Sequence, residues 1–298
     1  MSLTSAEIAT QPAAWRRAVE AAAGFEGLPK PGERVAVTGC GTSWFMAIAY
    51  AALREAAGLG ETDAFASSEF PAGRPYDRVV AITRSGTTTE VLDLLTALRG
   101  RIPTTALTAD PKTPVMPAAD AVAVLDWADE ESVVQTRFAT TALAFLRAGL
   151  GELPGLKTVA EAAVDAELAL TEPLPEDVLA AEQWTFLGRG WTYGLALEAA
   201  LKMREAAGAW TESYPAMEYR HGPIAITAPG RTTWVFGALP EGLAADVGRV
   251  GGTLVSRPET DPLAELVRAQ RLAVALAEAR GQDPDRPRNL TRSVILAP

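Results

Sequence analysis

The sequence has a single cysteine, Cys40, and a single histidine, His221, in 298 residues. One cysteine excludes an internal disulfide framework and a zinc cluster built on thiolates, and one of each argues against a structural transition-metal site. Uncharged apolar stretches of 18 residues are also absent, and the N-terminus lacks the apolar run of a signal peptide. These absences predict a cytoplasmic protein with no structural metal site and no membrane span. An organic cofactor is not expected either.

Positive charge is scarce as well. The 27 lysines and arginines are outnumbered by 37 acidic residues, which gives a formal net charge of −10. An acidic surface repels a phosphate backbone and no local basic patch compensates, so we expect no nucleic-acid partner. Hydrophobic residues make up 48% of the chain, which is enough for a large buried core in one large domain or two ordinary ones.

Short β-branched segments alternate with helical patterns in the first half of the chain. Such alternation predicts a parallel sheet covered on both faces. The predicted strands are 34–40, 78–83, 104–109 and 120–126, and the predicted helices are 43–60, 89–100 and 136–151.

The pattern then restarts after an Ala-rich helix at 157–170. It predicts strands at 184–190, 232–239 and 253–257 and helices at 193–210, 241–249 and 262–281. A strand that ends in Gly-x-Gly and opens a helix occurs twice, in "VTGCGTS" and "FLGRGWT". The sequence therefore predicts two flavodoxin-like α/β sandwiches related by internal duplication, with domains at 1–155 and 156–298.

Two loops that follow predicted strands are rich in hydroxyl groups. "GCGTS" (39–43) leads into a helix, and "TRSGTTTE" (83–90) surrounds a glycine with hydroxyls and one arginine. Free backbone N–H groups at helix N-termini, together with short hydroxyls, suit a phosphate. Ser and Thr also cap helices very often, which is the alternative for either loop alone. Two such loops favour an anion site, and nucleotide binding is disfavoured because no Walker or full dinucleotide motif is present.

The helical segment 193–210 carries three charges on one face. Glu198, Lys202 and Glu205 stand at i, i+4 and i+7. Glu–Lys pairs at this spacing usually decorate a solvated surface. Their neighbours here are apolar nearly all round the helix, which favours burial and charges that meet a cavity. The spacing alone leaves both interpretations open.

These segments resemble a known family. "GCGTS", "TRSGTTTE", "LGRGWTYGLALEAALKMREAA", "EYRHGPIAI" and "DRPRNLTRSV" are similar, in order over 34–297, to the isomerase half of glucosamine-6-phosphate synthase, which is built from two sugar isomerase (SIS) domains. The glutamine-hydrolysing domain of that synthase has no counterpart here. The resemblance therefore implies a stand-alone double-SIS protein, a group that includes phosphosugar isomerases, amino-sugar-phosphate deaminases and fructosamine-phosphate deglycases.

By position, the resemblance also implies a binding site for a sugar phosphate. The implied binding residues are Cys40, Gly41, Thr42 and Ser43 for the sugar, Thr83, Arg84, Ser85 and Thr88 for its phosphate, and Val133 and Val134 for the lining of the sugar pocket.

Four further residues match the catalytic region of the family. Glu205 matches the base that moves a proton between C1 and C2, and Lys202 matches the lysine one turn before it. Glu198 matches an acid with a supporting role. His221 matches the histidine that opens the sugar ring and is donated by the neighbouring subunit, which implies a homodimer with a shared site.

One position departs from the family. The synthase has Asn-Leu-Ala-Lys-Ser near its C-terminus, with a lysine that reaches the sugar, whereas this chain has "NLTRS" with Arg292. Arginine forms no Schiff base and does not act as a neutral base. A mechanism through a covalent sugar–lysine adduct is therefore doubtful, and recognition of a phosphate or hydroxyl by Arg292 stays open.

We therefore expect an aldose–ketose isomerase or deaminating isomerase acting on a hexose 6-phosphate or amino-hexose 6-phosphate. The alternatives are a fructosamine-phosphate deglycase and a non-catalytic sugar-phosphate sensor, because SIS folds also serve as regulatory modules. A sensor needs the hydroxyl-rich loops but not Glu205 together with His221, and the presence of both favours an enzyme.

Overall fold

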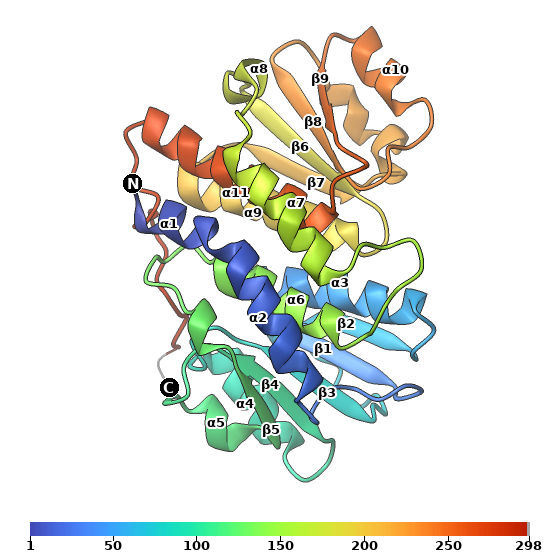
Figure 1. The fold of residues 1–298 in the computed structure, drawn as a ribbon, viewed down its shortest axis with the longest axis vertical. Helices are drawn as coiled ribbons and strands as arrows, with labels where there is room; N and C mark the ends of the chain where they lie inside the picture. Colours follow the sequence, from blue (N-terminus) through green and yellow to red (C-terminus); the bar gives the residue numbers. More distant parts are fainter. Residues whose placement is uncertain (297–298) are drawn as a thin grey trace. The chain divides into compact units, whose positions relative to one another are not determined.

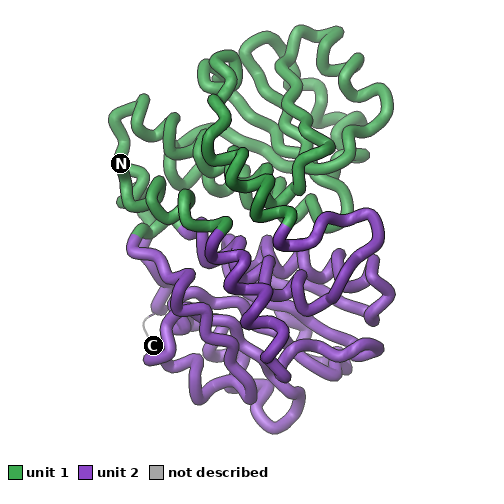
Figure 2. The backbone as a smooth tube through the Cα atoms, in the orientation of Figure 1, with its two compact units in different colours: residues 1–12, 132–134, 161–290 green, residues 13–131, 135–160, 291–298 purple. Residues whose placement is uncertain are grey.

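The structure is a computed structural model that describes residues 1–296 (Figure 1). The chain forms two compact units (Figure 2). Unit 1 comprises residues 1–12, 132–134 and 161–290, and unit 2 comprises 13–131, 135–160 and the chain from Thr291 onward. Both units therefore contain segments that are far apart in the sequence. The predicted domain boundary at 155/156 stays a prediction.

Unit 2 is built on a five-stranded parallel sheet. Its strand order is β2 (Thr62–Ala66), β1 (Val35–Gly39), β3 (Arg78–Ile82), β4 (Thr104–Thr108) and β5 (Ala121–Val124). Every residue of β1 and β4 is buried, as expected for central strands of a parallel sheet. The helices of this part of the chain are α2 (Gln11–Ala23), α3 (Thr42–Ala56), α4 (Thr89–Leu98), α5 (Val115–Ala118) and α6 (Arg137–Ala148).

Unit 1 has a four-stranded parallel sheet. Its strand order is β7 (Thr211–Pro215), β6 (Gln183–Gly188), β8 (Arg231–Phe236) and β9 (Thr253–Ser256). Helix α9 (Thr192–Ala207) packs against α11 (Pro262–Ala279). The other helices of this part are α1 (Leu3–Ala9), α7 (Val159–Thr171), α8 (Glu176–Leu179) and α10 (Leu243–Arg249), with short 3-10 turns at Glu218–His221 and Pro223–Ile226.

The two sheets confirm the predicted fold class of two parallel-sheet α/β sandwiches. The two sheets share one strand order. The second strand along the chain (β2 or β7) lies at the edge, the first strand (β1 or β6) lies next to it, and the third and fourth strands follow on the other side of the first. This is the flavodoxin-like order, in which the direction of winding reverses between the first and third strands. The duplication itself stays a prediction.

The glycine that ends the first strand has the same role in each unit. A Cβ at Gly39 would lie 2.8 Å from the backbone carbon of Ser43, and a Cβ at Gly188 would lie 2.2 Å from the backbone oxygen of Thr192. Any side chain would therefore collide with the helix that follows. The repeated Gly-x-Gly thus reflects the close packing of α3 on β1 and of α9 on β6.

The segment 281–290, which follows α11 in unit 1, is fixed to the N-terminal helix. The Asp285 carboxylate accepts hydrogen bonds from the backbone N–H groups of Leu3 and Thr4, at 2.8 and 2.7 Å, and from the Thr4 hydroxyl at 2.7 Å. Burial raises the pKa of Asp285, but the hydrogen bonds from Thr4 and Leu3 lower it more, so that it lies below its ordinary value.

We expect Asp285→Asn to lower the free energy of unfolding at neutral pH by about 1 kcal/mol, because two N–H groups of α1 lose an ionised acceptor. A depressed folded-state pKa contributes stability above the unfolded pKa and loses it as the pH falls through the folded value. The difference in urea unfolding between wild type and variant should therefore begin to shrink below about pH 4 and should disappear only below the folded-state pKa of Asp285. A difference that persists unchanged at pH 3 would contradict this assignment.

Candidate active site

The hydroxyl-rich loops of unit 2 begin at the carboxyl ends of β1 and β3. These two strands are neighbours in the sheet, with Thr38 opposite Ala81. The winding reverses between them, and this is the place where doubly wound sheets bind their ligands. The structure thus brings together the two segments that the sequence singled out, 39–43 and 83–88.

The N-cap positions of the two helices that follow these loops are not capped by a hydroxyl. The residues at the N-caps of α3 and α4, Gly41 and Thr88, make no side-chain capping hydrogen bond. The side chain of Thr83 is 3% exposed, and within residues 1–296 its hydroxyl has no hydrogen-bond partner. Because buried polar groups are nearly always paired, a bare hydroxyl at this position favours an anion site over simple capping.

The turn of the second loop depends on Gly86. Its φ of +62° lies in the left-handed region, and a Cβ would come within 2.1 Å of the Thr113 hydroxyl. We expect Gly86→Ala to destabilise the protein by about 1–3 kcal/mol and to weaken binding of inorganic phosphate, because the loop must move. Thermal unfolding and phosphate titration measure the two effects. Gly100→Ala is the matched control, since Gly100 has φ +71° but open space around it. Equal loss of phosphate binding in both variants would contradict the proposed role of the loop.

The remaining implied sugar-binding residues lie at the start of α3. Thr42 and Ser43 are each 4% exposed, and Gly41 is exposed. Cys40 is half-buried, and burial raises the pKa of its thiol. The raised pKa keeps the thiol protonated at neutral pH, which suits a lining residue rather than a nucleophile.

Arg84 lies in a setting that the sequence did not indicate. Its side chain is 4% exposed and forms an ion pair with Glu130, whose side chain is fully buried, at 3.6 Å. The Glu130 carboxylate also accepts the backbone N–H groups of Thr136, Arg137 and Phe138 at the start of α6. The charge of Arg84 is therefore already balanced within the protein, and its guanidinium ties the loop 83–88 to α6.

The chain from Thr291 onward returns to the same loop. Ser293 Oγ accepts hydrogen bonds from the hydroxyls of Ser85 and Thr87, at 3.1 and 2.9 Å. Arg292 bonds to Asp129 and to the backbone oxygen of Glu130. Ser293 is thus a residue of the candidate site that sequence reasoning missed. The sequence left open whether Arg292 recognises a phosphate or a hydroxyl. In the structure its side chain is paired with the carboxylate of Asp129.

The charged face of α9 lies in unit 1 and is largely buried. Glu198 and Lys202 are 0% and 1% exposed, and Lys202 Nζ lies 3.5 Å from Glu198 Oε1. Lys202 also forms a shorter ion pair with Glu205, whose side chain is 18% exposed. These charges do not decorate a solvated surface. Glu205, the most exposed of the three, lines an open pocket.

The other implied site residues of unit 1 are separate from this pocket. His221 is exposed at the end of a 3-10 turn and does not line the pocket that contains Glu205. Val134 is 2% exposed, and the N–H of Val133 donates to the backbone oxygen of Asp285 at 3.3 Å. The segment 132–134 therefore contacts the chain segment that borders the Glu205 pocket.

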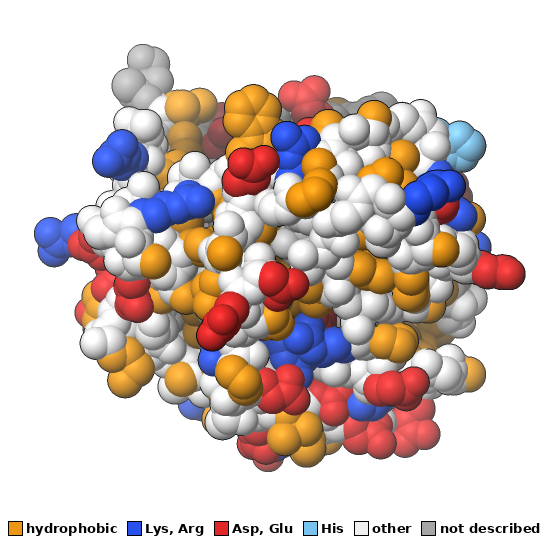
Figure 3. All heavy atoms as spheres, turned by 90° about the horizontal axis from the view of Figure 1, so that it is seen from above, with side chains coloured by type: hydrophobic (Ala, Val, Ile, Leu, Met, Phe, Trp, Pro, Cys, Tyr) orange, Lys and Arg blue, Asp and Glu red, His pale blue; other side chains and the backbone are white. Residues whose placement is uncertain are grey.

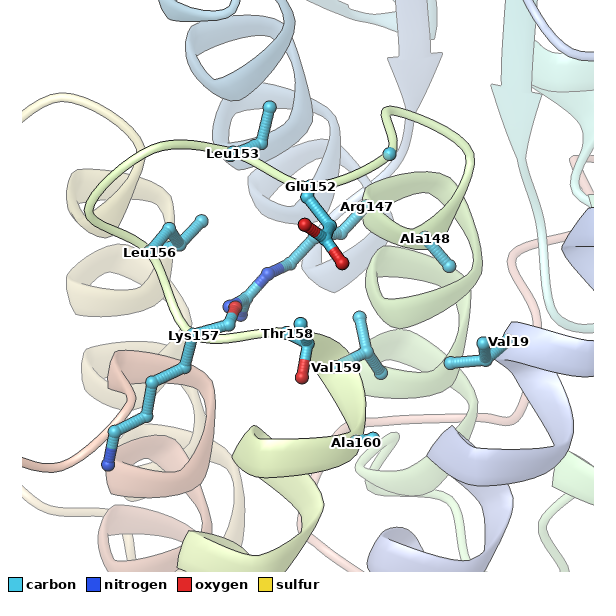
Figure 4. Close-up of a pocket in the computed structure, with 11 residues that line it drawn as sticks. Val19, Arg147, Ala148, Glu152, Leu153, Leu156, Lys157, Thr158, Val159 and Ala160 are labelled. Atoms are coloured by element: carbon cyan, nitrogen blue, oxygen red, sulfur yellow. The ribbon is translucent and has the colours of Figure 1, made fainter.

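Other pockets among residues 1–296 contain none of the predicted site residues, as two examples illustrate. In unit 2, a cavity of about 220 Å³ lies between the end of α6 and the loop 149–158. Figure 4 shows Arg147 beneath this loop, where it donates to the backbone oxygen of Lys157. In unit 1, a pocket of about 630 Å³ lies beyond β6 and β8 and is lined by Arg189 and Arg220. It corresponds in topology to the hydroxyl-rich site of unit 2 but lacks its serines and threonines.

The distribution of surface charge and the hydropathy of the helices agree with the expectations from the amino-acid composition. On the face shown in Figure 3, lysine and arginine side chains are interspersed with acidic ones. Among residues 1–296 no helix combines the length and apolarity needed to span a bilayer. In the same part of the chain, no three histidine, cysteine or acidic side chains cluster as a candidate metal site.

No family model matches the chain. Glutamine–fructose-6-phosphate aminotransferase [isomerizing] of Xanthomonas campestris pv. campestris is 29% identical over 357 residues, which cover 97% of this chain and 58% of that protein. The chain spans about half the length, or less, of the curated relatives that it matches.

Solved structures share the fold over nearly the whole chain. Glucosamine-6-phosphate deaminase from Thermotoga maritima has a TM-score of 0.82 and 24% identity, and the match covers 99% of this chain and 100% of that one. Tagatose-6-phosphate ketose/aldose isomerase from Escherichia coli has a TM-score of 0.79 and 20% identity, covering 100% and 96%. The chain is therefore similar over nearly its whole length to part of a glutamine–fructose-6-phosphate aminotransferase, which confirms the resemblance predicted from the sequence, and it shares its fold of two parallel sheets with these solved structures.

Proposed function

We propose that this protein is an enzyme that isomerises or deaminates a hexose 6-phosphate or amino-hexose 6-phosphate by moving a proton between C1 and C2 through an enediol or enolamine. The observation that carries the proposal is the setting of Glu205. Its carboxylate is held by the buried Lys202 and still lines an open pocket. A general base must be both fixed in position and accessible to the substrate, and Glu205 meets both requirements.

The hydroxyl-rich loops support a phosphorylated substrate. The bare hydroxyl of Thr83 offers a hydrogen-bond donor that suits a phosphate. It lies in the loop before α4, whose N-cap makes no side-chain hydrogen bond and whose first N–H, that of Thr89, donates to the backbone oxygen of Val294. A bound phosphate supplies binding energy that positions the reacting carbons. Lys202 stabilises the negative charge that develops on the enediolate oxygen. The names of two compared proteins, an isomerizing aminotransferase and a glucosamine-6-phosphate deaminase, agree with this class of substrate.

The proposal includes a homodimer in which His221 opens the sugar ring at the site of a second copy. It is supported by the exposure of His221 and by its absence from the lining of the Glu205 pocket. Mixing Glu205→Gln with His221→Ala protein under subunit exchange is then expected to restore about a quarter of wild-type activity, because half of the dimers carry one intact site. Turnover of cyclic sugar phosphates measures this. No restoration, with exchange verified by mass, would contradict the shared site.

The test of the function is a panel of hexose and amino-hexose 6-phosphates incubated in deuterium oxide. Uptake of deuterium at C1 or C2 shows isomerisation, and release of ammonia shows deamination. Binding without either signal would instead indicate a sugar-phosphate sensor. Absence of both binding and exchange for every compound would overturn the proposal.

A further inference from the structure

Residues 291–296 (the returning segment) place backbone and side-chain oxygens on the loop 83–88. The Arg84 guanidinium donates to the backbone oxygen of Arg292 at 3.2 Å. Ser293 Oγ accepts two hydroxyl hydrogens of the loop, at 3.1 and 2.9 Å. The loop and the returning segment both belong to unit 2, so these contacts lie within one compact part of the chain.

The start of α4 is bound to the same segment. The N–H of Thr89 donates to the backbone oxygen of Val294 at 3.3 Å, and the N–H of Leu296 donates to the Thr89 hydroxyl at 2.9 Å. An N–H group in the first turn of a helix has no partner within the helix and is suited to an anion. Three consecutive residues, 292–294, therefore present three acceptor oxygens to the loop and the helix, as a phosphate monoester would.

The hydroxyl groups of the loop serve one set of acceptors at a time. A hydroxyl carries a single hydrogen, and those of Ser85 and Thr87 are donated to Ser293. A phosphate bound through the same hydrogens excludes Ser293 from them. The Thr83 hydroxyl is buried and has no hydrogen-bond partner within residues 1–296 while the returning segment is in place. A phosphate that also reaches this hydroxyl satisfies one more buried group, which favours the exchange.

Little apolar burial holds the returning segment in place. Val294, Ile295 and Leu296 are 53%, 70% and 54% exposed. The segment is held instead by its hydrogen bonds and by the ion pair of Arg292 with Asp129, whose side chains are 38% and 40% exposed. Ion pairs that are open to solvent contribute little to stability, and segments with few buried apolar contacts open readily. The returning segment can therefore be displaced without unfolding the unit.

We propose that the returning segment is an internal inhibitor, which occupies the hydrogen-bond donors of the loop 83–88 until the phosphate of a substrate displaces it. This inference rests on the proposed function in one respect, namely that the loop binds a phosphate. The apparent affinity for phosphate is then lowered by the fraction of molecules in which the segment occupies the loop. A segment that closed over a bound phosphate would have the opposite effect, because the ligand and the closed segment would stabilise each other.

Ser293→Ala tests the inference in the whole chain, with inorganic phosphate as the probe and calorimetry as the measurement. The substitution removes the acceptor of two hydroxyl hydrogens, so we expect phosphate to bind about threefold more tightly than in wild type. In Arg292→Gln/Ser293→Ala, which also loses the ion pair with Asp129, we expect about tenfold. The lost positive charge would by itself weaken phosphate binding, so charge does not explain a gain. Ile295→Ala, at an exposed apolar position of the same segment, is the matched control and should bind phosphate as wild type does.

Amide exchange at Leu296 gives a second measurement, because the N–H of this residue is bound to Thr89 only while the returning segment is in place. We expect saturating phosphate to speed hydrogen exchange of the Leu296 amide in wild type by about threefold or more, as followed by NMR. A segment that closes over the ligand would instead be protected, and the exchange would slow.

The outcomes separate this inference from the proposed function. Tighter phosphate binding in Ser293→Ala, together with faster exchange at Leu296 when phosphate binds, would support the internal inhibitor even if no phosphosugar is turned over. Unchanged or weaker binding in Ser293→Ala, or slower exchange at Leu296, would overturn it even if the protein isomerises or deaminates a phosphosugar. Failure of wild type and both variants to bind phosphate would also overturn it, and proton exchange on the sugar panel would then decide the proposed function by itself.

Discussion

Glu205→Gln is expected to lower proton exchange between C1 and C2 by a factor of about 10³, within the range for loss of a general base. Glutamine keeps the shape of the side chain but does not accept the proton. Lys202 retains Glu198 at 3.5 Å as an ionic partner, so the buried part of α9 keeps its charge balance. The measurement is deuterium incorporation at C1 and C2, followed by NMR.

Binding separates a catalytic loss from a structural one. The affinity of the Glu205→Gln variant for the phosphosugar should stay within about threefold of wild type, because the phosphate supplies most of the binding energy. Glu278→Gln, an exposed glutamate on α11, is the matched control and should keep full exchange. If the Glu205 variant retains exchange, the base lies elsewhere. If it loses binding and exchange together, Glu205 has a structural role.

The central strands of both sheets and the edge strands β5 and β9 could be predicted from the sequence, whereas the edge strands on the other side of each sheet could not. The buried strands β1 and β3 are continuous apolar runs, and each was placed within one residue of its observed bounds. The edge strands β2 and β7 were missed. Their sequences, "TDAFA" and "TESYP", are short, polar and only partly buried, so they lack the apolar run by which a buried strand is recognised.

Those parts of the candidate site that lie within one short segment could also be predicted from the sequence, because each loop directly follows its strand. The hydroxyl-rich loop and the charged face of α9 are examples. Contacts made by distant residues were not accessible. Ser293 reaches Ser85 across more than 200 positions, and Glu130 meets Arg84 only because the sheet places them together. No periodicity or motif encodes such pairs, and the packing of the whole unit decides them.

Glu130 is the distant residue with the largest expected effect on stability. Its side chain is fully buried, accepts three backbone N–H groups at the start of α6 and pairs with Arg84. Glu130→Gln removes the charge and turns an N–H₂ group toward some of these donors. We expect a loss of about 3 kcal/mol, because the variant leaves a buried arginine without compensation. For a unit of this size that corresponds to roughly 6–12 °C in the unfolding midpoint. Glu69→Gln, on an exposed acid of unit 2, should change the midpoint little.

A double-mutant cycle with Arg84→Met tests whether the pair itself is the cause. If the loss in Glu130→Gln comes from an unpaired guanidinium, removing that guanidinium should recover part of the stability, so that the double variant is more stable than the sum of the single changes predicts. The three backbone donors of α6 stay poorly satisfied in either case, so the recovery should be incomplete. Strict additivity would contradict the pairing and would assign the whole effect to the start of α6. Phosphate binding in the two single variants then shows whether Arg84 contacts the anion directly or holds the loop in place. A direct contact predicts that binding falls in Arg84→Met and not in Glu130→Gln, whereas a positioning role through the ion pair predicts that both substitutions weaken it.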